Sequence, residues 1–254
     1  MSDEVLTERR GQILVVTINR PRARNAVNRA VAEAMAAAMD ELDGDAGLTL
    51  GILTGAGGSF SSGMDLKAFV TGERPTLPDR GFAGLTQAPP RKPLIAAVEG
   101  YALAGGCELV LACDLVVAAE TAKFGIPEVK RGLVAAAGGL MRLPRLVPPA
   151  IAMELALTGD FMDATDAYRY GLVNRLVPEG GALDGALELA ARVTPNGPLA
   201  VAASKRIMRE SADWSSAEMW QRQLAIVEPV MTSADATEGA RAFAEKRPPV
   251  WRGE

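Results

Sequence analysis

The first half of the chain alternates short β-branched runs with stretches of helical spacing. Residues 12–18 predict a strand, and residues 26–42, whose apolar positions recur at the spacing of a helix, predict a helix with Asn25 as its N-cap. Residues 49–54 predict a second strand, and residues 60–65 predict a turn that leads into another helix.

The same order continues in the middle of the chain. Residues 94–98 and 115–118 predict two strands, and residues 105–113 between them predict a short helix. Strands that alternate with helices are typical of a sheet covered by helices, so the predicted fold class is α/β. The segment from residue 72 to residue 93 contains too many prolines for regular structure and predicts a long loop.

Helical spacing dominates the chain beyond Pro144. One further strand is predicted at residues 172–177, and a Pro, Asn and Gly cluster at residues 195–198 predicts a boundary. The boundary divides an α/β core of residues 1–194 from a C-terminal helical segment of residues 195–254. The predicted helices are residues 151–157, 164–170, 183–193, 200–211, 216–230 and 236–246.

Composition narrows the possible chemistry, because the 254 residues include no histidine and only two cysteines. Ser-His-Asp and Cys-His catalysis are excluded, and a zinc site would lack its usual nitrogen and sulfur ligands. We therefore expect carboxylates or backbone groups to carry any catalysis, without a metal.

The charge pattern and the apolar runs limit the partners. A net charge of −4 without a long Lys/Arg run argues against nucleic acid as a partner. The longest apolar stretch, residues 94–119, is interrupted by Glu99, Glu108 and Asp114, which argues against a membrane span. Because the cysteines are few and no apolar region follows a basic start, we expect a soluble, cytoplasmic, reduced protein.

Glu108 is the one charged residue in the predicted helix at residues 105–113. A helix that is apolar on all sides is buried, so Glu108 is expected to be buried with it. Burying an unpaired carboxylate costs on the order of several kcal/mol, and desolvation raises its pKa toward neutrality, which suits a proton carrier. The alternative is an ion pair with a residue distant in sequence. Glu128, which follows Pro127, is by itself typical of a surface acid in the first turn of a helix.

The glycines before Glu108 predict a place for developing negative charge. Gly105 and Gly106 at a helix start leave backbone N–H groups free, and the helix dipole adds to their attraction for an oxyanion. The turn at residues 60–65 offers a second donor, the N–H of Met64. Ordinary tight turning is the alternative for either glycine-containing stretch.

Several motifs follow one another along nearly the whole chain. They are NRPRARNA at residues 19–26, FSSGMDL at 60–66, GYALAGGCEL at 100–109, FGIPE at 124–128, EG at 238–239 and AFAEKR at 242–247. Together they resemble the crotonase family, the enoyl-CoA hydratase/isomerase superfamily, and several independent motifs are more specific than one short pattern. The resemblance implies a spiral of ββα units with a C-terminal helical segment. That segment would complete the site and the oligomer, a homotrimer or homohexamer.

The resemblance also implies roles for individual residues. The N–H groups of Met64 and Gly105 match the family's oxyanion hole, and Glu108 and Glu128 match the two catalytic glutamates of its hydratases. The positions that match its contacts with coenzyme A are Met64, Asp65, Leu66 and Lys67. The implied activity is reversible addition of water to a 2-enoyl-CoA, with Glu108 as base toward water and Glu128 as acid at C2. No cofactor is expected, because coenzyme A is part of the acyl-CoA substrate.

Other activities within the family stay open. Isomerases commonly keep only the second glutamate, so the pair favours a hydratase. The segments GFAGLT at residues 81–86, LVPPAI at 146–151 and PVWRG at 249–253 resemble the carnitinyl-CoA dehydratase branch, whose substrate class is the alternative. Glu99, Ala104 and the pair Ala135-Ala136 depart from the family's usual residues and are expected on the pocket wall.

Two further hypotheses lie outside this chemistry. A catalytically weak scaffold or RNA-binding member of the superfamily would carry a basic row on an exposed helix, which the charge of −4 disfavours. A Rossmann dehydrogenase would need the G-x-G-x-x-G spacing, which residues 55–58 lack.

Overall fold

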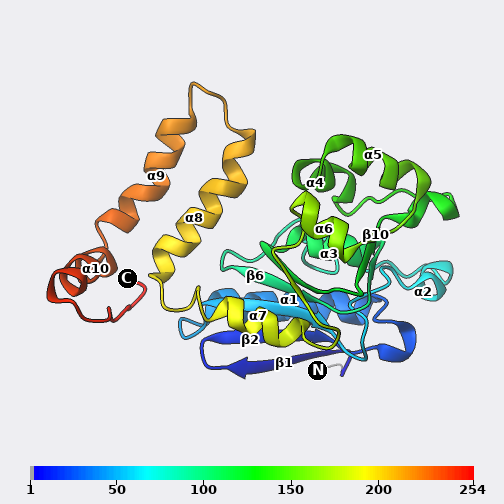
Figure 1. Ribbon diagram of the computed structural model, residues 1–254, viewed down its shortest axis with the longest axis horizontal. Helices are drawn as coiled ribbons and strands as arrows, with labels where there is room; N and C mark the ends of the chain where they lie inside the picture. Colours follow the sequence, from blue (N-terminus) through cyan, green and yellow to red (C-terminus); the bar gives the residue numbers. More distant parts are fainter. Residues whose placement is uncertain (1–2) are drawn as a thin grey trace.

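A six-stranded sheet forms the centre of the protein (Figure 1). The computed structural model describes residues 3–254, and the strand order in this sheet is β1-β2-β3-β6-β8-β11. β1 and β2 are antiparallel, whereas the other neighbours are parallel. The strands are β1 (Val5–Arg10), β2 (Ile13–Ile18), β3 (Leu50–Gly55), β6 (Leu94–Val98), β8 (Leu115–Ala119) and β11 (Arg175–Val177). The predicted α/β class is confirmed. β1 was not predicted, because only Val5 among its residues is buried.

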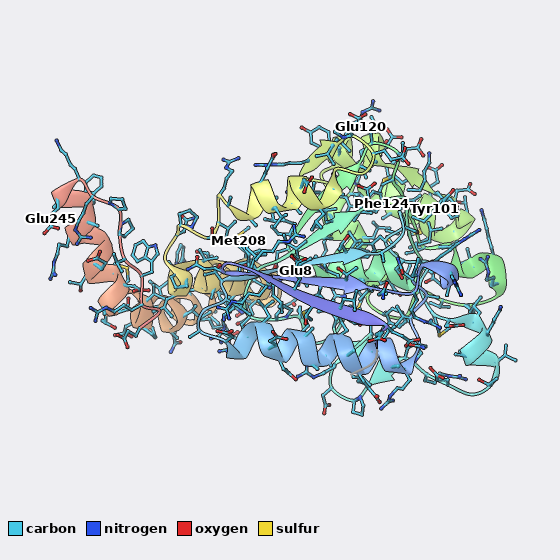
Figure 2. The ribbon with its side chains drawn as sticks, turned by 90° about the horizontal axis from the view of Figure 1, so that it is seen from below. Glu8, Tyr101, Glu120, Phe124, Met208 and Glu245 are labelled. Atoms are coloured by element: carbon cyan, nitrogen blue, oxygen red, sulfur yellow. The ribbon has the colours of Figure 1, made fainter. Side chains whose placement is uncertain are left out.

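Alternate residues of the strands pack against two different helices, one on each face of the sheet. Val15 and Ile52 pack with α7 (Ala182–Ala190), whereas Val16 and Leu53 pack on the side of α1 (Arg29–Gly44). Successive side chains of a strand point to opposite faces, so consecutive residues enter different cores. In Figure 2, α1 (blue) and α7 (yellow) lie on opposite sides of the strands.

Asn25 is not the N-cap of α1, and that prediction was wrong. The helix begins at Arg29, and the side chain of Asn28 caps it. Asn25 is fully buried with a positive φ of 54°, a conformation that Asn tolerates better than most residues. Its side-chain amide donates hydrogen bonds to the carbonyls of Ala56 at 2.8 Å and Ser59 at 2.6 Å, so Asn25 anchors the loop after β3.

A second, smaller sheet contains two strands that directly follow strands of the central sheet. Its order is β10 (Met162–Asp163), β9 (Lys123–Gly125), β7 (Tyr101–Leu103). β6 leads into β7 and then into α3 (Gly105–Ala112), and β8 leads into β9 and then into the 3-10 helix η2 (Pro127–Arg131). The chain therefore repeats a strand–strand–helix unit, as the expected spiral of ββα units requires.

The remaining elements of the body surround these units. Residues 72–93 hold a hairpin of two very short strands, β4 (Thr76–Leu77) and β5 (Gly81–Phe82), and are otherwise irregular, as their prolines predict. The other helices are η1 (Pro21–Ala23), α2 (Leu66–Val70), α4 (Gly139–Leu146), α5 (Pro149–Thr158) and α6 (Ala164–Tyr170). α4 was not predicted, since Pro144 lies inside it. Among the helices of residues 3–254, none has the length and apolar content that crossing a membrane requires.

The C-terminal helices extend away from the α/β body (Figure 1). They are α8 (Pro198–Glu210), the 3-10 helix η3 (Ser211–Asp213), α9 (Met219–Met231) and α10 (Ala234–Glu245). Figure 2 shows Glu245 far from Phe124 of the body. An ionic cluster ties α8 to the body, because Asp114 binds Lys205 at 2.6 Å and Arg209 at 2.8 Å. The helices of this segment were predicted, and its division from the core at residue 195 stays a prediction.

Candidate active site

A cavity of about 810 Å³ brings every predicted site residue together. These residues come from the turn before α2, from α2 itself, from α3 and from η2. On the cavity wall they are Met64, Asp65, Leu66, Lys67, Gly105, Glu108 and Glu128. Their convergence on one cavity is observed, whereas the roles assigned to them stay predictions.

Strand register explains why the two glutamates meet. Ala102 of β7 pairs in parallel with Phe124 of β9. Parallel pairing keeps both chains in the same direction, so the segments that follow the two strands leave the sheet side by side. Glu108 lies in the first turn of α3 and Glu128 in the first turn of η2, and both carboxyl groups therefore reach the same cavity.

Glu108 is buried, with 3% of its surface exposed. Its Oε1 accepts hydrogen bonds from the backbone N–H groups of Ala137 at 2.7 Å and Gly139 at 2.9 Å. No ion pair within residues 3–254 includes Glu108, so the ion-pair alternative is wrong. Burial raises the pKa of Glu108, and the two N–H groups together with the charge of Arg142 lower it only in part. The upward direction agrees with the prediction from sequence.

Glu128 is half-buried and has less support for its negative charge. Burial raises the pKa of Glu128 to about 7, and the charge of Glu108 adds to the rise, against smaller lowering by its own backbone N–H and by Arg131. Its Oε2 is buried and accepts no hydrogen bond from any residue in the described part of the chain. Glu128 is therefore not the ordinary surface acid that its local sequence suggested, and it can hold a proton at neutral pH.

Met64 and Gly105 both line the cavity, and the segments that hold them lie side by side. Ser61 forms a parallel bridge with Ala102, which sets the turn around Met64 beside the start of α3. Val27 donates its N–H to the carbonyl of Gly63 and accepts a hydrogen bond from the N–H of Asp65. Because N–H groups alternate in direction along such a parallel bridge, the N–H of Met64 points away from Val27. Gly105 is the first residue of α3, where an N–H has no acceptor within the helix. Neither N–H donates a hydrogen bond within residues 3–254, and their joint role in holding one oxygen atom stays a prediction.

Close packing, as well as tight turning, explains the glycines at the start of α3. A Cβ on Gly105 would lie 2.5 Å from the Phe82 ring, and a Cβ on Gly106 would overlap the carbonyl of Ser61. Ala104, just before them, has a φ of 52° and a ψ of −129°, a conformation that residues other than glycine seldom adopt. The backbone that presents the Gly105 N–H is therefore strained at Ala104.

The apolar part of the cavity wall was not predicted. Phe82 comes from the loop at residues 72–93, and Phe161 follows α5. Single apolar residues in irregular segments leave no periodic signal from which their place could be inferred. The larger apolar lining residues outside the predicted site are Phe69, Phe82, Leu103, Pro127, Leu133, Val134 and Phe161, and the basic ones are Arg20, Arg22, Arg24, Lys67 and Arg131.

The residues that depart from the family pattern do not all reach the cavity. Ala104 and Ala136 line it as expected, but Glu99 and Ala135 do not. The carboxylate of Glu99 instead accepts hydrogen bonds at 2.8 and 3.1 Å from two backbone N–H groups at the start of α7. Negative charge is favourable at a helix N-terminus, so Glu99 stabilises α7 rather than shaping the pocket.

The described chain shows two further features of the site. Within residues 3–254, no group of three or more His, Cys, Asp or Glu side chains is arranged to hold a metal ion. The wall of the cavity is formed by residues that precede the C-terminal segment. The predicted part of residues 195–254 in completing the site therefore stays a prediction.

Comparison with known proteins relates the whole chain to one family. The model described as enoyl-CoA hydratase/isomerase matches residues 8–254. A carnitinyl-CoA dehydratase from Salmonella enteritidis is 44% identical, over the full length of both chains. The crystal structure of an enoyl-CoA hydratase from Mycobacterium tuberculosis is 62% identical, with a TM-score of 0.98 over 100% of both chains. That of a carnitinyl-CoA hydratase from Mycobacterium avium is 46% identical, with a TM-score of 0.80 over 100% of both chains.

These similarities confirm the crotonase-like fold expected from the motifs. The Rossmann hypothesis is wrong, because the glycines at residues 55–58 lead into the extended bridge at Ser61 and not into a helix.

Proposed function

The chain belongs to the enoyl-CoA hydratase/isomerase family, and on this basis we propose that it is a hydro-lyase that adds water reversibly across the 2,3 double bond of a 2-enoyl-CoA. One observation carries the proposal. Glu108 and Glu128 converge on one cavity beside two backbone N–H groups that have no acceptor in the described chain. Relatives named as hydratases and dehydratases support the same class of reaction.

The two carboxyl groups divide the proton transfers. Glu108, whose anion two N–H groups stabilise, takes a proton from water while the water oxygen attacks C3. Glu128, with a pKa of about 7, holds a proton at neutral pH and delivers it to C2. The return of a proton from Glu108 to Glu128 restores the starting state.

The N–H groups of Met64 and Gly105 hold the thioester oxygen during this addition. Negative charge moves onto that oxygen as the C3–O bond forms, and one donor in an oxyanion hole contributes roughly 3–4 kcal/mol. Arg22 and Arg24 line the cavity near the turn before α2, where cations suit the phosphates of coenzyme A. The assigned coenzyme A contacts are Met64, Asp65, Leu66 and Lys67. Coenzyme A is part of the substrate, so the reaction needs no separate cofactor.

Carnitinyl-CoA dehydration is the alternative substrate class, and the names of relatives at 44% and 46% identity favour it. Its substrate carries a quaternary ammonium group. Among the described lining residues the carboxylates are Glu108, Glu128 and Asp65, and Asp65 is already paired with Arg20 at 2.9 Å. An uncharged acyl chain fits the apolar wall better than a cation does. Isomerisation is less supported, because both glutamates are present.

A comparison of substrates tests the proposal. Purified protein is mixed with crotonyl-CoA, longer 2-enoyl-CoAs and crotonobetainyl-CoA, and the loss of the enoyl-thioester absorbance is followed. We expect turnover of crotonyl-CoA, with a higher kcat/KM than for crotonobetainyl-CoA. The opposite order would favour the carnitinyl-CoA class, and movement of the double bond without hydration would favour an isomerase. No turnover of any 2-enoyl-CoA would reject the hydratase function and favour a scaffold.

We further propose that α8–α10 bind a second copy of the chain, in a homotrimer or homohexamer. The side chains of α8 and α9 include none that is fully buried within the described chain. Trp220 on α9 is 69% exposed and Phe243 on α10 is 88% exposed. Clusters of large exposed apolar side chains mark interaction surfaces, and helices that extend from the body can reach a neighbouring copy.

A further inference from the structure

Arg142, on α4, is a half-buried cation that forms no ion pair within residues 3–254. Its Nη2 donates a hydrogen bond to the carbonyl of Thr86 at 2.5 Å, and its Nη1 donates one to the carbonyl of Ala137 at 3.3 Å. Two neutral carbonyls do not fully offset the cost of removing a guanidinium from water. Packing alone therefore does not explain why a guanidinium lies at this position.

The carboxylate that this charge acts on is Glu108. Arg142 holds the peptide between Ala137 and Gly138, which lies between the two peptides whose N–H groups donate to Glu108. Gly138 has a φ of 102°, and a Cβ on it would overlap the Arg142 guanidinium. Arg142 thus fixes the segment that carries both donors of Glu108 and adds positive charge that favours its anion.

Glu128 has no equivalent support. Its Oε2 is buried without a hydrogen-bond partner among the residues described, and the cation that acts on it, Arg131, is exposed. When two carboxyl groups face one another and share a proton, the proton resides on the one whose anion is less stabilised.

We propose, on the basis of the hydratase function above, that Arg142 is the positioning residue that makes Glu108 the base of the pair and leaves Glu128 as the acid. Arg142 acts through Glu108 and is absent from the cavity wall of the described chain. Three other groups face this cluster. Arg131 lies beside Glu128 on η2, Arg209 on α8 acts on Arg142, and Cys107 lies beside both glutamates. Burial raises the pKa of the Cys107 thiol to about 12, so it is neutral.

The test compares Arg142→Met with Arg142→Lys in the pH profile of kcat/KM for crotonyl-CoA. Arg142→Met removes the charge, so the acid limb, where Glu108 becomes protonated, should move to higher pH by about one unit. We also expect kcat to fall about tenfold or more. Arg142→Lys keeps the charge and should keep the acid limb near that of the wild type. Arg145→Met, an exposed position on the same helix, is the matched control and should change neither quantity.

The proposal is overturned if the acid limb of Arg142→Met stays at the wild-type pH and Arg142→Lys loses as much kcat as Arg142→Met. Arg142 would then have a structural role only. If neither variant folds, a titration of the wild type tests the order of the two glutamate pKa values. Side-chain ¹³C shifts of the glutamates, assigned with Glu108→Gln and Glu128→Gln, should show Glu108 titrating at the lower pH, and the reverse order rejects the proposal. No hydration by the wild type would reject the hydratase function instead. The shift of the Glu108 titration in Arg142→Met would then still test the role of Arg142.

Discussion

Gly63 lies so close to the backbone nitrogen of Gly105 that a Cβ on Gly63 would be 2.7 Å from that nitrogen. Gly63 also has a φ of 87°, which disfavours any side chain. The Gly105 N–H is one of the two proposed oxyanion donors, so the missing side chain at position 63 keeps it open to a ligand.

Gly63→Ala is therefore expected to lower kcat for crotonyl-CoA by about 10²–10³-fold, as the loss of one oxyanion donor does. Gly72→Ala is the matched control, because Gly72 has a φ of 93° and nothing within 4 Å of an added Cβ. Both variants should lose about 1 kcal/mol of stability through the strained φ, and Gly63→Ala should lose more because its Cβ also meets neighbouring atoms. Equal losses of kcat in the two variants would remove the Gly105 N–H from the mechanism.

Ala104→Gly is expected to raise the free energy of unfolding by about 1 kcal/mol, because glycine adopts the observed φ of 52° and ψ of −129° without strain. Hydration activity should be retained, since the Gly105 N–H stays in place. Ala102→Gly, in the regular strand β7, serves as the control and should be destabilised by a similar amount. Chemical denaturation measures both, and an Ala104→Gly variant less stable than the wild type would show that the backbone there is not strained.

Glu108→Gln and Glu128→Gln are each expected to lower kcat by about 10²–10⁴-fold, because each removes one proton transfer. Coenzyme A binding, measured by calorimetry, should stay close to that of the wild type, since neither residue belongs to the assigned coenzyme A contacts. Glu120→Gln, at an exposed acid, is the control. Near-normal activity in either site variant would exclude that glutamate from the reaction.

The wild-type hydration rate is expected to fall as the pH rises through about 7. Glu128 must be protonated to act as the acid at C2, and its pKa is about 7. The pH profile of kcat/KM for crotonyl-CoA measures this basic limb. A rate that stays level to pH 9 would show that Glu128 is not the acid.

Glu128→Gln is expected to be more stable than the wild type at pH 7. Burial raises the folded pKa of Glu128 from 4.5 to about 7, so the folded state binds more protons than the unfolded state between these values. The free energy of unfolding of the wild type therefore falls as the pH rises through this window. The difference should be roughly 1 kcal/mol at pH 7, after allowance for solvent screening, and should vanish below pH 4.5. A difference that does not change with pH would contradict this origin.

Trp220→Glu and Leu224→Glu, one helical turn apart on α9, are expected to reduce the mass of the assembly in light scattering, because each places a charge in the proposed contact between copies. Arg222→Gln, on the same helix, is the control and should leave the mass unchanged. A wild type that is monomeric at micromolar concentration would reject the interface.

The sequence alone determined the local features of this protein. Short β-branched or apolar runs predicted the strands of the central sheet except β1, helical spacing predicted most of the helices, and an isolated carboxylate in an apolar helix indicated the buried Glu108. These features could be predicted because backbone preference and burial leave a mark on neighbouring residues. β1 was not predicted because it is almost wholly exposed, and α4 was not predicted because it contains a proline.

Only the tertiary structure decided how these features meet. The parallel pairing of Ala102 with Phe124 and Ser61 sets Glu108 beside Glu128 and the Met64 turn beside Gly105. Without the family's motifs, nothing in the local sequence would assign Glu128 to the site. Arg142 and Glu99 gave no sign of their contacts either, because each acts on backbone groups more than 40 residues away, Arg142 on Thr86 and Glu99 on the start of α7. Strand pairing and such contacts join segments that are distant along the chain, and a pattern of neighbouring residues carries no information about them.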